Sequence, residues 1–300
     1  MPGFPVSIAI EPTTACNLRC PQCVSGLRSF TRPTGMMNMT LFNRIIIPLK
    51  KYLANLTLYF QGEPFLNPDF FDMISTAHKN GIYTMTSTNG HYLTGENAKR
   101  VINSGLDRII ISVDSFDQTS YSRYRIGGNI ETVTQGIENL VRMRDEMRSS
   151  TPFIILQFIA FRDNENRLAE YKKAGYSLGA DRVSIKTMQI YDYQSGSELM
   201  TRNGKLSRYR QSKDGGYEIR NSFFNHCWKM WHSCVVTWDG MVIPCCFDKD
   251  AGHPMGSIHG MDLKGIWADR KYRDFRKTIL SSRASVDMCT NCTEGSHVLI

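Results

Sequence analysis

Short apolar runs rich in β-branched residues alternate with longer amphipathic stretches along most of this chain, from its first residues to about residue 187. This alternation limits the fold more than any other feature, because strands that alternate with helices build a parallel sheet covered by helices. The run 108–113 is apolar almost throughout, as expected for a parallel strand buried on both faces. Strands are predicted at 6–11, 56–60, 82–87, 108–114, 153–160 and 182–187.

The segments between these strands are expected to be helical. Residues 68–80 carry Phe70, Phe71, Ile74 and Ala77 at helical spacing, and Gly81 provides a stop. Residues 130–148 show the same amphipathic spacing. Six such units predict an α/β fold, a partial (β/α)6 TIM-like barrel, in which functional groups lie at the C-terminal ends of the strands.

The pattern changes after residue 187. Residues 191–216 are polar and rich in Ser, Gly, Lys and Arg, which is typical of a loop or linker. A small Cys-rich module follows from His226, with a hairpin expected around Asp239 and Gly240 and a helix over 263–280. The sequence therefore predicts a barrel over 1–190, a linker over 191–225 and a C-terminal module over 226–300.

Hydropathy and charge narrow the class of protein. The chain has no apolar run of the ~20 residues that span a bilayer, and its N-terminus lacks the pattern of a signal peptide, so a cytoplasmic protein is expected. Its formal net charge is +8, but Lys and Arg are scattered over the predicted helices. We therefore expect neither nucleic-acid nor membrane binding, and an acidic electron donor such as a flavodoxin or ferredoxin is a suitable partner.

Nine cysteines are present, and in a reducing compartment they are expected to bind metal or do redox chemistry. Cys16, Cys20 and Cys23 follow the first predicted strand in CxxxCxxC spacing. A loop with three cysteines can hold a four-iron cluster while leaving one iron open to a cofactor. Zinc with a distant fourth ligand, or three unrelated thiols, are the alternatives. The position at a strand's C-terminal end favours the cluster.

This loop resembles that of the radical S-adenosylmethionine (SAM) superfamily, in which three cysteines after the first barrel strand bind a [4Fe-4S] cluster. Gln61-Gly62-Glu63-Pro64 after the second strand is similar to the superfamily's GGEP motif, which holds the amino group of SAM, although Gln61 replaces the first Gly. The resemblance implies further SAM contacts at the ends of the third and fourth strands: Ser87, Asn89, Ser112 and Asp114. A turn at Asn89 and helix capping by Ser112 and Asp114 are the alternatives.

The C-terminal module contains the other six cysteines. Cys227, Gly240 and Cys245 match the CX9-15GX4C spacing of SPASM and twitch domains, and the resemblance implies an auxiliary [4Fe-4S] cluster bound by Cys227, Cys245, Cys289 and Cys292. Only eight residues follow Cys292, which favours the one-cluster, twitch-like form. Cys234 is expected to be a core thiol, Cys246 could replace one ligand, and a zinc site is the alternative.

The resemblance implies reductive cleavage of SAM to a 5'-deoxyadenosyl radical, hydrogen abstraction, and substrate oxidation through the auxiliary cluster. A small polyol or amino sugar is the expected substrate, because little sequence precedes the first strand to hold a peptide-recognition domain. A maturase acting on a ribosomally made peptide or protein is the alternative, and a metal-binding or electron-transfer module is the non-enzyme alternative. The candidates for a catalytic base are Lys186, Asp192, His226 and Asp248.

Overall fold

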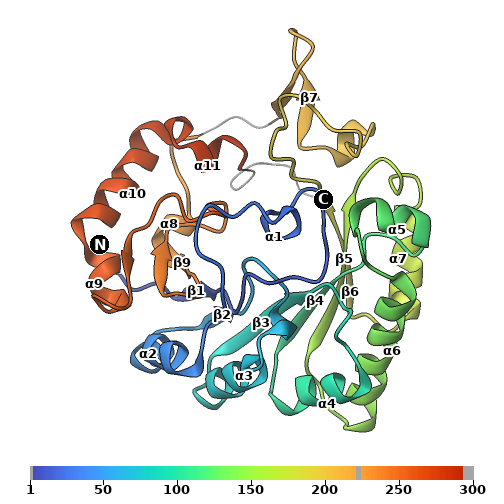
Figure 1. The fold of residues 1–300 in the computed structure, drawn as a ribbon, viewed down its shortest axis with the longest axis horizontal. Coiled ribbons are helices and arrows are strands. Elements are labelled where there is room, and N and C mark those ends of the chain that lie inside the picture. Colours follow the sequence, from blue (N-terminus) through green and yellow to red (C-terminus); the bar gives the residue numbers. More distant parts are fainter. Residues whose placement is uncertain (1–2, 221–223, 293–300) are drawn as a thin grey trace.

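The computed structural model describes residues 3–220 and 224–292, and its central element is a nine-stranded sheet that curves into an arc (Figure 1). Strand order is β11-β10-β9-β1-β2-β3-β4-β5-β6. The strands are β1 Ser7–Ile10, β2 Asn55–Thr57, β3 Tyr83–Thr88, β4 Arg108–Ser112, β5 Phe153–Ala160, β6 Arg182–Thr187, β9 Ser233–Val236, β10 Met241–Ile243 and β11 Gly256–Ser257. Each of the six predicted strands is present.

The first six strands pair in parallel in sequence order, so the α/β class and the partial barrel are confirmed. Helices lie on the outer side of the arc, whereas α1 lies inside it (Figure 1). The helices of this part are α1 Val24–Leu27, α2 Met39–Leu49, α3 Phe70–Lys79, α4 Gly95–Asn103, α5 Gln118–Tyr124, α6 Ile130–Glu146 and α7 Leu168–Ser177, with a 3-10 turn at Pro64–Leu66.

One continuous core fills the space between the sheet and its outer helices. Ile8, Leu56 and Ile109 of the sheet are fully buried, as are Phe42 of α2 and Phe70 of α3. Burying a side chain of this size contributes roughly 1.5–3 kcal/mol, so this layer is what holds the strand ends in fixed positions. Within the described ranges, no helix has the length and apolar character needed to cross a membrane.

Two strands end two or three residues earlier than predicted, each for a local reason. The fourth strand ends at Ser112 instead of residue 114, because Asp114 adopts a left-handed backbone conformation with φ of 60°. The second strand ends at Thr57, because Tyr59 and Phe60 turn away to line a cavity. Both departures therefore occur at the edge of the sheet where function was expected.

The C-terminal module extends the barrel sheet. Strand β9 pairs in parallel with β1, from Ser7 opposite Ser233 to Ile10 opposite Val236, and β10 pairs antiparallel with β9. The hairpin predicted at Asp239 and Gly240 is therefore present, and Gly240 turns with φ of 82°. The module also contains α8 Lys229–His232, α9 Leu263–Ala268, α10 Arg270–Ser282, a 3-10 turn at Arg283–Ser285 and α11 Asp287–Thr290.

Two predictions outside the barrel were wrong in detail. The single helix expected over 263–280 is two helices, because Asp269 has an extended backbone and its side chain accepts a hydrogen bond from Lys271 N, which starts α10. The predicted linker contains a 3-10 turn at Gly204–Leu206 and a small hairpin, β7 Tyr209–Gln211 with β8 Tyr217–Ile219. Strands of three residues are too short to show a period of two.

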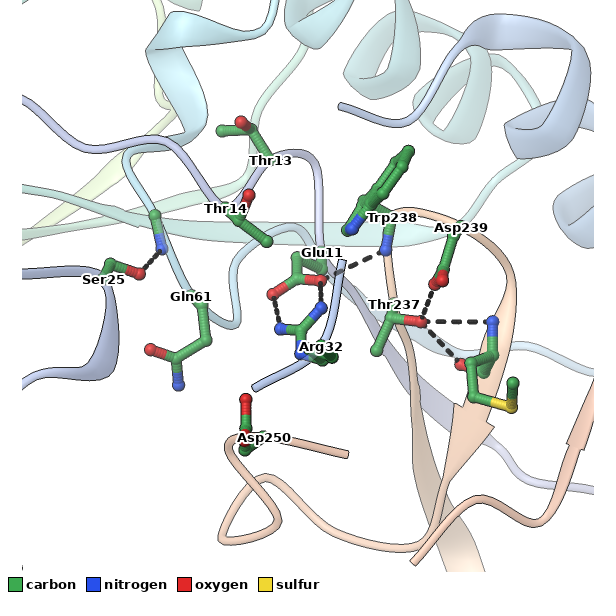
Figure 2. Close-up of polar contacts among 12 residues, drawn as sticks. Glu11, Thr13, Thr14, Ser25, Arg32, Gln61, Thr237, Trp238, Asp239 and Asp250 are labelled. Atoms are coloured by element: carbon green, nitrogen blue, oxygen red, sulfur yellow. Dashed lines mark hydrogen bonds and ion pairs between the residues drawn. The ribbon is translucent and has the colours of Figure 1, made fainter. Parts of the chain in front are cut away.

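A buried ion pair ties the first strand to the C-terminal hairpin (Figure 2). Arg32 donates to both carboxylate oxygens of Glu11, at 2.6 and 2.9 Å, and Trp238 N donates to the same carboxylate at 3.2 Å. The Glu11 side chain is fully buried, and that of Arg32 is 10% exposed. Three segments that are far apart in the sequence, namely β1, the chain after the cysteine loop and the hairpin turn, therefore meet at one charged contact.

Candidate functional site

The predicted site residues gather around one cavity at the C-terminal ends of the parallel strands. The cavity has a volume of about 410 Å³. All of the predicted barrel ligands line it except Asp114: Cys16, Cys20, Cys23, Gln61, Gly62, Glu63, Ser87, Asn89 and Ser112. Residues from β1 to β4 thus converge on a single space, as the barrel topology predicts.

The cysteine loop follows β1 and ends in the short helix α1, which packs directly on it. Gly26 of α1 lies so close to Cys20 that a Cβ at this position would overlap the Cys20 carbonyl oxygen and lie 2.5 Å from Cys20 N. Ser25 Oγ accepts a hydrogen bond from Gly62 N at 2.8 Å. The loop is therefore fixed against both α1 and the turn that follows β2.

The three thiols are half-buried or buried. Burial raises the pKa of Cys16 to about 11 and also raises the pKa of Cys20. The Arg125 guanidinium, whose Nη1 lies 3.8 Å from Cys20 Sγ, opposes the rise at Cys20. Thiolates bind iron, and three of them in one loop are the donor set of a cluster with one open iron, so these residues fit a [4Fe-4S] cluster.

The turn after β2 requires glycine at position 62. Its φ is 73°, and a Cβ would overlap Thr13 O and lie 2.7 Å from Ala15 O. Glu63 N donates to Ala15 O at 2.7 Å, so this turn packs against the start of the cysteine loop. The close approach explains why only glycine fits here, and it brings backbone atoms of both segments to the cavity wall.

Glu63 fixes the neighbouring strand end. Its carboxylate accepts hydrogen bonds from Thr88 Oγ1 at 2.7 Å, Asn89 N at 2.8 Å and Phe65 N at 3.3 Å. The side chain is buried, and burial raises its pKa to about 7 despite these three donors. A carboxyl that titrates near neutrality on the cavity wall can accept an ammonium group of a ligand or hold the loop as a neutral group.

Asn89 connects the end of β3 to the cysteine loop. Its Nδ2 donates to Asn17 Oδ1 at 2.7 Å and lies 3.9 Å from Cys16 Sγ. Ser87 and Ser112 line the cavity beside it. The turn at Asn89 and Gly90, which the sequence left as an alternative, is also present, because Gly90 has a φ of 85°. The same residue therefore makes the turn and lines the cavity.

Asp114, which the resemblance implies as a SAM contact, is engaged by other groups of the protein. Its carboxylate is fully buried, accepts from Arg125 Nε at 2.6 Å and Ile159 N at 2.7 Å, and does not line the cavity. Helix capping is not its role, since Asp117 is the N-cap of α5. Asp114 instead holds Arg125 at the cavity edge. No motif points to Arg125, because residue spacing does not reveal the partner of a buried carboxylate.

The C-terminal cysteines form a second group. Cys227, Cys245 and Cys289 pack in one small apolar cluster with Met230, Ile279 and Val286. Arg283 Nη2 lies 3.3 Å from Cys292 Sγ, and the charges of Cys292, Cys227 and Cys289 raise the pKa of Arg283. These four predicted ligands therefore surround a common region, and Cys227 directly precedes Trp228, the N-cap of α8.

The two remaining cysteines of the module differ from each other. Cys234 is buried in β9 within the main core, and burial raises its pKa to about 12, so it is the core thiol that the sequence predicts. Cys246 is exposed, and Lys229 Nζ lies 3.8 Å from its Sγ. Across residues 3–220 and 224–292, no three His, Cys, Asp or Glu side chains lie close enough to ligate a single metal ion.

Of the four candidate bases, only Lys186 lines the cavity. Asp248 is buried elsewhere and accepts hydrogen bonds from Gly252 N and His253 N, which makes it a structural residue of its loop. Two cations that the sequence did not single out, Arg208 and Lys249, also line this cavity. They come from the predicted linker and from the C-terminal module, outside the strand ends where the barrel motifs lie.

Comparison with known proteins agrees with these two groups of cysteines. The family model described as the radical SAM superfamily matches residues 10–157, and that of an iron-sulfur cluster-binding domain, SPASM, matches residues 227–293. A "Tungsten-containing aldehyde ferredoxin oxidoreductase cofactor-modifying protein" from Pyrococcus furiosus is 26% identical over 316 aligned residues, which cover 95% of this chain and 86% of that protein.

Solved structures share the fold. BtrN in complex with AdoMet and 2-DOIA has a TM-score of 0.60 and 19% identity, with 100% of this chain and 97% of that chain covered. SuiB of Streptococcus suis bound to precursor peptide SuiA has a TM-score of 0.71 and 14% identity, with 98% and 72% covered. Both comparisons span the sheet and the C-terminal module together.

Proposed function

The chain belongs to the radical SAM superfamily and carries a C-terminal SPASM domain, and from that premise we propose that it is a maturase that modifies a ribosomally made peptide or protein. It is an enzyme that uses SAM and iron-sulfur clusters. When bound, the cluster and SAM supply a 5'-deoxyadenosyl radical that takes a hydrogen atom from the substrate.

The protein's own groups position these reactants. Cys16, Cys20 and Cys23 would hold the first cluster, and the turn at Gly62 and Glu63 would receive the amino group of SAM beside it. Cys227, Cys245, Cys289 and Cys292 would hold the auxiliary cluster, which would supply an acceptor for the electron left on the substrate. Ser87, Asn89 and Ser112 remain the proposed contacts of SAM, whereas Asp114 acts through Arg125.

The size of the cavity is the observation that carries the choice of substrate. A space of about 410 Å³ is what one drug-sized ligand fills, and the cluster and SAM, when bound, would take up most of it. The substrate therefore inserts one small group, such as a single side chain of a peptide whose remainder lies outside the cavity. The solved SuiB complex, which contains a precursor peptide, supports the same choice.

A small polyol or amino-sugar metabolite is the second candidate, and a specific likeness favours it. The BtrN structure that contains 2-DOIA spans 100% of this chain and 97% of its own. This candidate is the first expectation from the sequence. It is placed second here because the similar proteins include a cofactor-modifying protein and a structure with a bound precursor peptide. An acidic flavodoxin- or ferredoxin-type protein remains the proposed electron donor, because the net charge of this chain is +8.

Hydrogen transfer distinguishes the two substrates. The reconstituted enzyme, SAM and dithionite are incubated without oxygen with either the peptide fraction or the small-metabolite fraction of cells grown in deuterated medium. A maturase gives deuterium in 5'-deoxyadenosine with the peptide fraction alone, as measured by mass spectrometry. Deuterium from the metabolite fraction alone would replace the maturase with the second candidate. The variant Cys16→Ala/Cys20→Ala/Cys23→Ala is the control that should give no deoxyadenosine.

A further inference from the structure

Two cations of the cavity wall, Arg208 and Lys249, have no role in SAM cleavage as described above. Arg208 directly precedes β7, and Lys249 follows β10, so neither belongs to the barrel strands. Both line the cavity that holds the predicted SAM residues. The linker and the C-terminal module therefore each supply one positive charge to the same space.

Arg208 is held rigidly and has unused hydrogen-bonding capacity. Its Nε donates to Thr187 Oγ1 at 3.2 Å and its Nη2 to Thr187 O at 3.0 Å, at the end of β6. Only 9% of the residue is exposed, and its Nη1 is buried without a hydrogen-bond partner. A buried N–H group without a partner is costly, so a site of this kind is built for a ligand that accepts from it.

Lys249 is oriented in a similar way. Its Nζ donates to Gln189 Oε1 at 3.3 Å and lies 4.5 Å from the ring centroid of Tyr191. Burial lowers the pKa of Lys249 to about 8, and the nearby charge of Arg208 contributes to this decrease. No carboxylate in the described part of the chain pairs with Arg208 or Lys249. Two neighbouring cations, neither of which is paired with a carboxylate, favour the binding of a carboxylate ligand.

We propose that Arg208 and Lys249 bind a carboxylate of the substrate and thereby set which substrate carbon faces SAM. A planar guanidinium presents its N–H donors in a fork that matches a carboxylate, and Lys249 adds a point charge. This inference rests on the proposed function, in which the carboxylate belongs to an acidic side chain of the peptide. It assigns specificity to the two segments outside the barrel.

The anion site is tested first without any peptide. Succinate is titrated by calorimetry into the reconstituted enzyme saturated with SAM. The variants Arg208→Gln and Lys249→Gln should each weaken succinate binding at least about tenfold, which corresponds to ~1.4 kcal/mol. Lys213→Gln removes an exposed charge in the β7–β8 turn and is the matched control that should bind succinate as the parent does. Arg208→Lys keeps the charge without the fork and should recover only part of the affinity.

Two results would overturn the assignment. Succinate binding that is equal in the parent, Arg208→Gln and Lys249→Gln would mean that these cations hold no carboxylate of a ligand. A loss of SAM affinity in the variants, measured in the same way without succinate, would mean that the carboxylate of SAM itself occupies the site.

The link to the proposed function is tested separately. Two pools of synthetic peptides with random flanks, one with a central Glu and one with a central Gln, are compared by equilibrium dialysis. The parent should retain the Glu pool at least about tenfold better, and Arg208→Gln should abolish this preference. Retention of neither pool, with succinate binding intact, would contradict the peptide substrate and leave the anion site standing. Equal retention of both pools would contradict the role of these cations in selecting the substrate.

Discussion

Loss of Arg32 should destabilise the fold through the carboxylate that it leaves behind. Glu11 is fully buried and accepts two hydrogen bonds from Arg32, so Arg32→Met leaves it with the Trp238 backbone donor alone. Burial already raises the pKa of Glu11 above its ordinary value of 4.5, and the loss of the guanidinium raises it further. In the variant, Glu11 should therefore bind a proton near neutral pH, because the neutral carboxyl is lower in free energy than an unpaired buried carboxylate.

The size of the effect follows from that proton. Protonating a carboxyl of pKa 4.5 at about pH 7 costs roughly 3.4 kcal/mol, since each pH unit is worth ~1.36 kcal/mol. With the loss of the bidentate contact, Arg32→Met should lower the free energy of unfolding by about 3–5 kcal/mol. The folded variant keeps a proton that the unfolded chain releases above pH 4.5, so the deficit should shrink by up to ~1.4 kcal/mol per unit as pH falls from about 7 to 5.

Reversible urea unfolding of the iron-free chain measures this effect. The double variant Glu11→Gln/Arg32→Met removes the carboxylate as well and should be more stable than Arg32→Met near neutral pH. A deficit below about 1 kcal/mol, or a double variant no more stable than the single one, would refute the argument that an uncompensated buried charge is the cause.

Three further predictions concern single residues. Gly62→Ala should lower SAM affinity at least about tenfold and cost ~2–4 kcal/mol of stability in chemical denaturation, because its Cβ overlaps Thr13 O. Gly81→Ala is the matched control, since Gly81 has the same φ of 73° but open space around it. This variant should cost only ~1 kcal/mol and leave SAM binding unchanged. The pKa of Glu63 is about 7 in the folded chain and 4.5 in the unfolded chain. The free energy of unfolding should therefore fall by up to ~3 kcal/mol as pH rises from about 4.5 through 7. Iron-free Glu63→Gln should lack this part of the pH dependence in thermal melts. Cys234→Ala should cost ~1–2 kcal/mol and keep the iron content of the parent, whereas Cys245→Ala should lose the auxiliary cluster; iron loss from Cys234→Ala would contradict the core role of this thiol.

The barrel was predictable because its signals are local. β-Branched runs predict buried parallel strands, and β5 and β6 have the predicted bounds. The cysteine spacing and the Gly62 turn lie directly after strands, so the topology alone brings them to one edge of the sheet. Most of the proposed SAM-side residues therefore line the cavity as the sequence predicts.

The remaining features depend on tertiary contacts that no local pattern encodes. The pairing of β9 with β1 joins segments more than two hundred residues apart, and no periodicity specifies which edge a hairpin will join. The pairing of Asp114 with Arg125 was not predicted, because Arg125 comes from the following helix region. Arg208 and Lys249 were missed because isolated cations in a loop and a turn give no motif.

Anaerobic reconstitution with iron and sulfide, followed by iron counting and assay of 5'-deoxyadenosine with SAM and dithionite, tests the central claim most directly. The parent should bind about eight irons per chain and form deoxyadenosine, and Cys16→Ala/Cys20→Ala/Cys23→Ala should keep about four irons and form none. Deoxyadenosine formation that survives in the triple variant would contradict the assignment of the first cluster. Zinc in place of iron in the parent, without deoxyadenosine, would contradict the account as a whole.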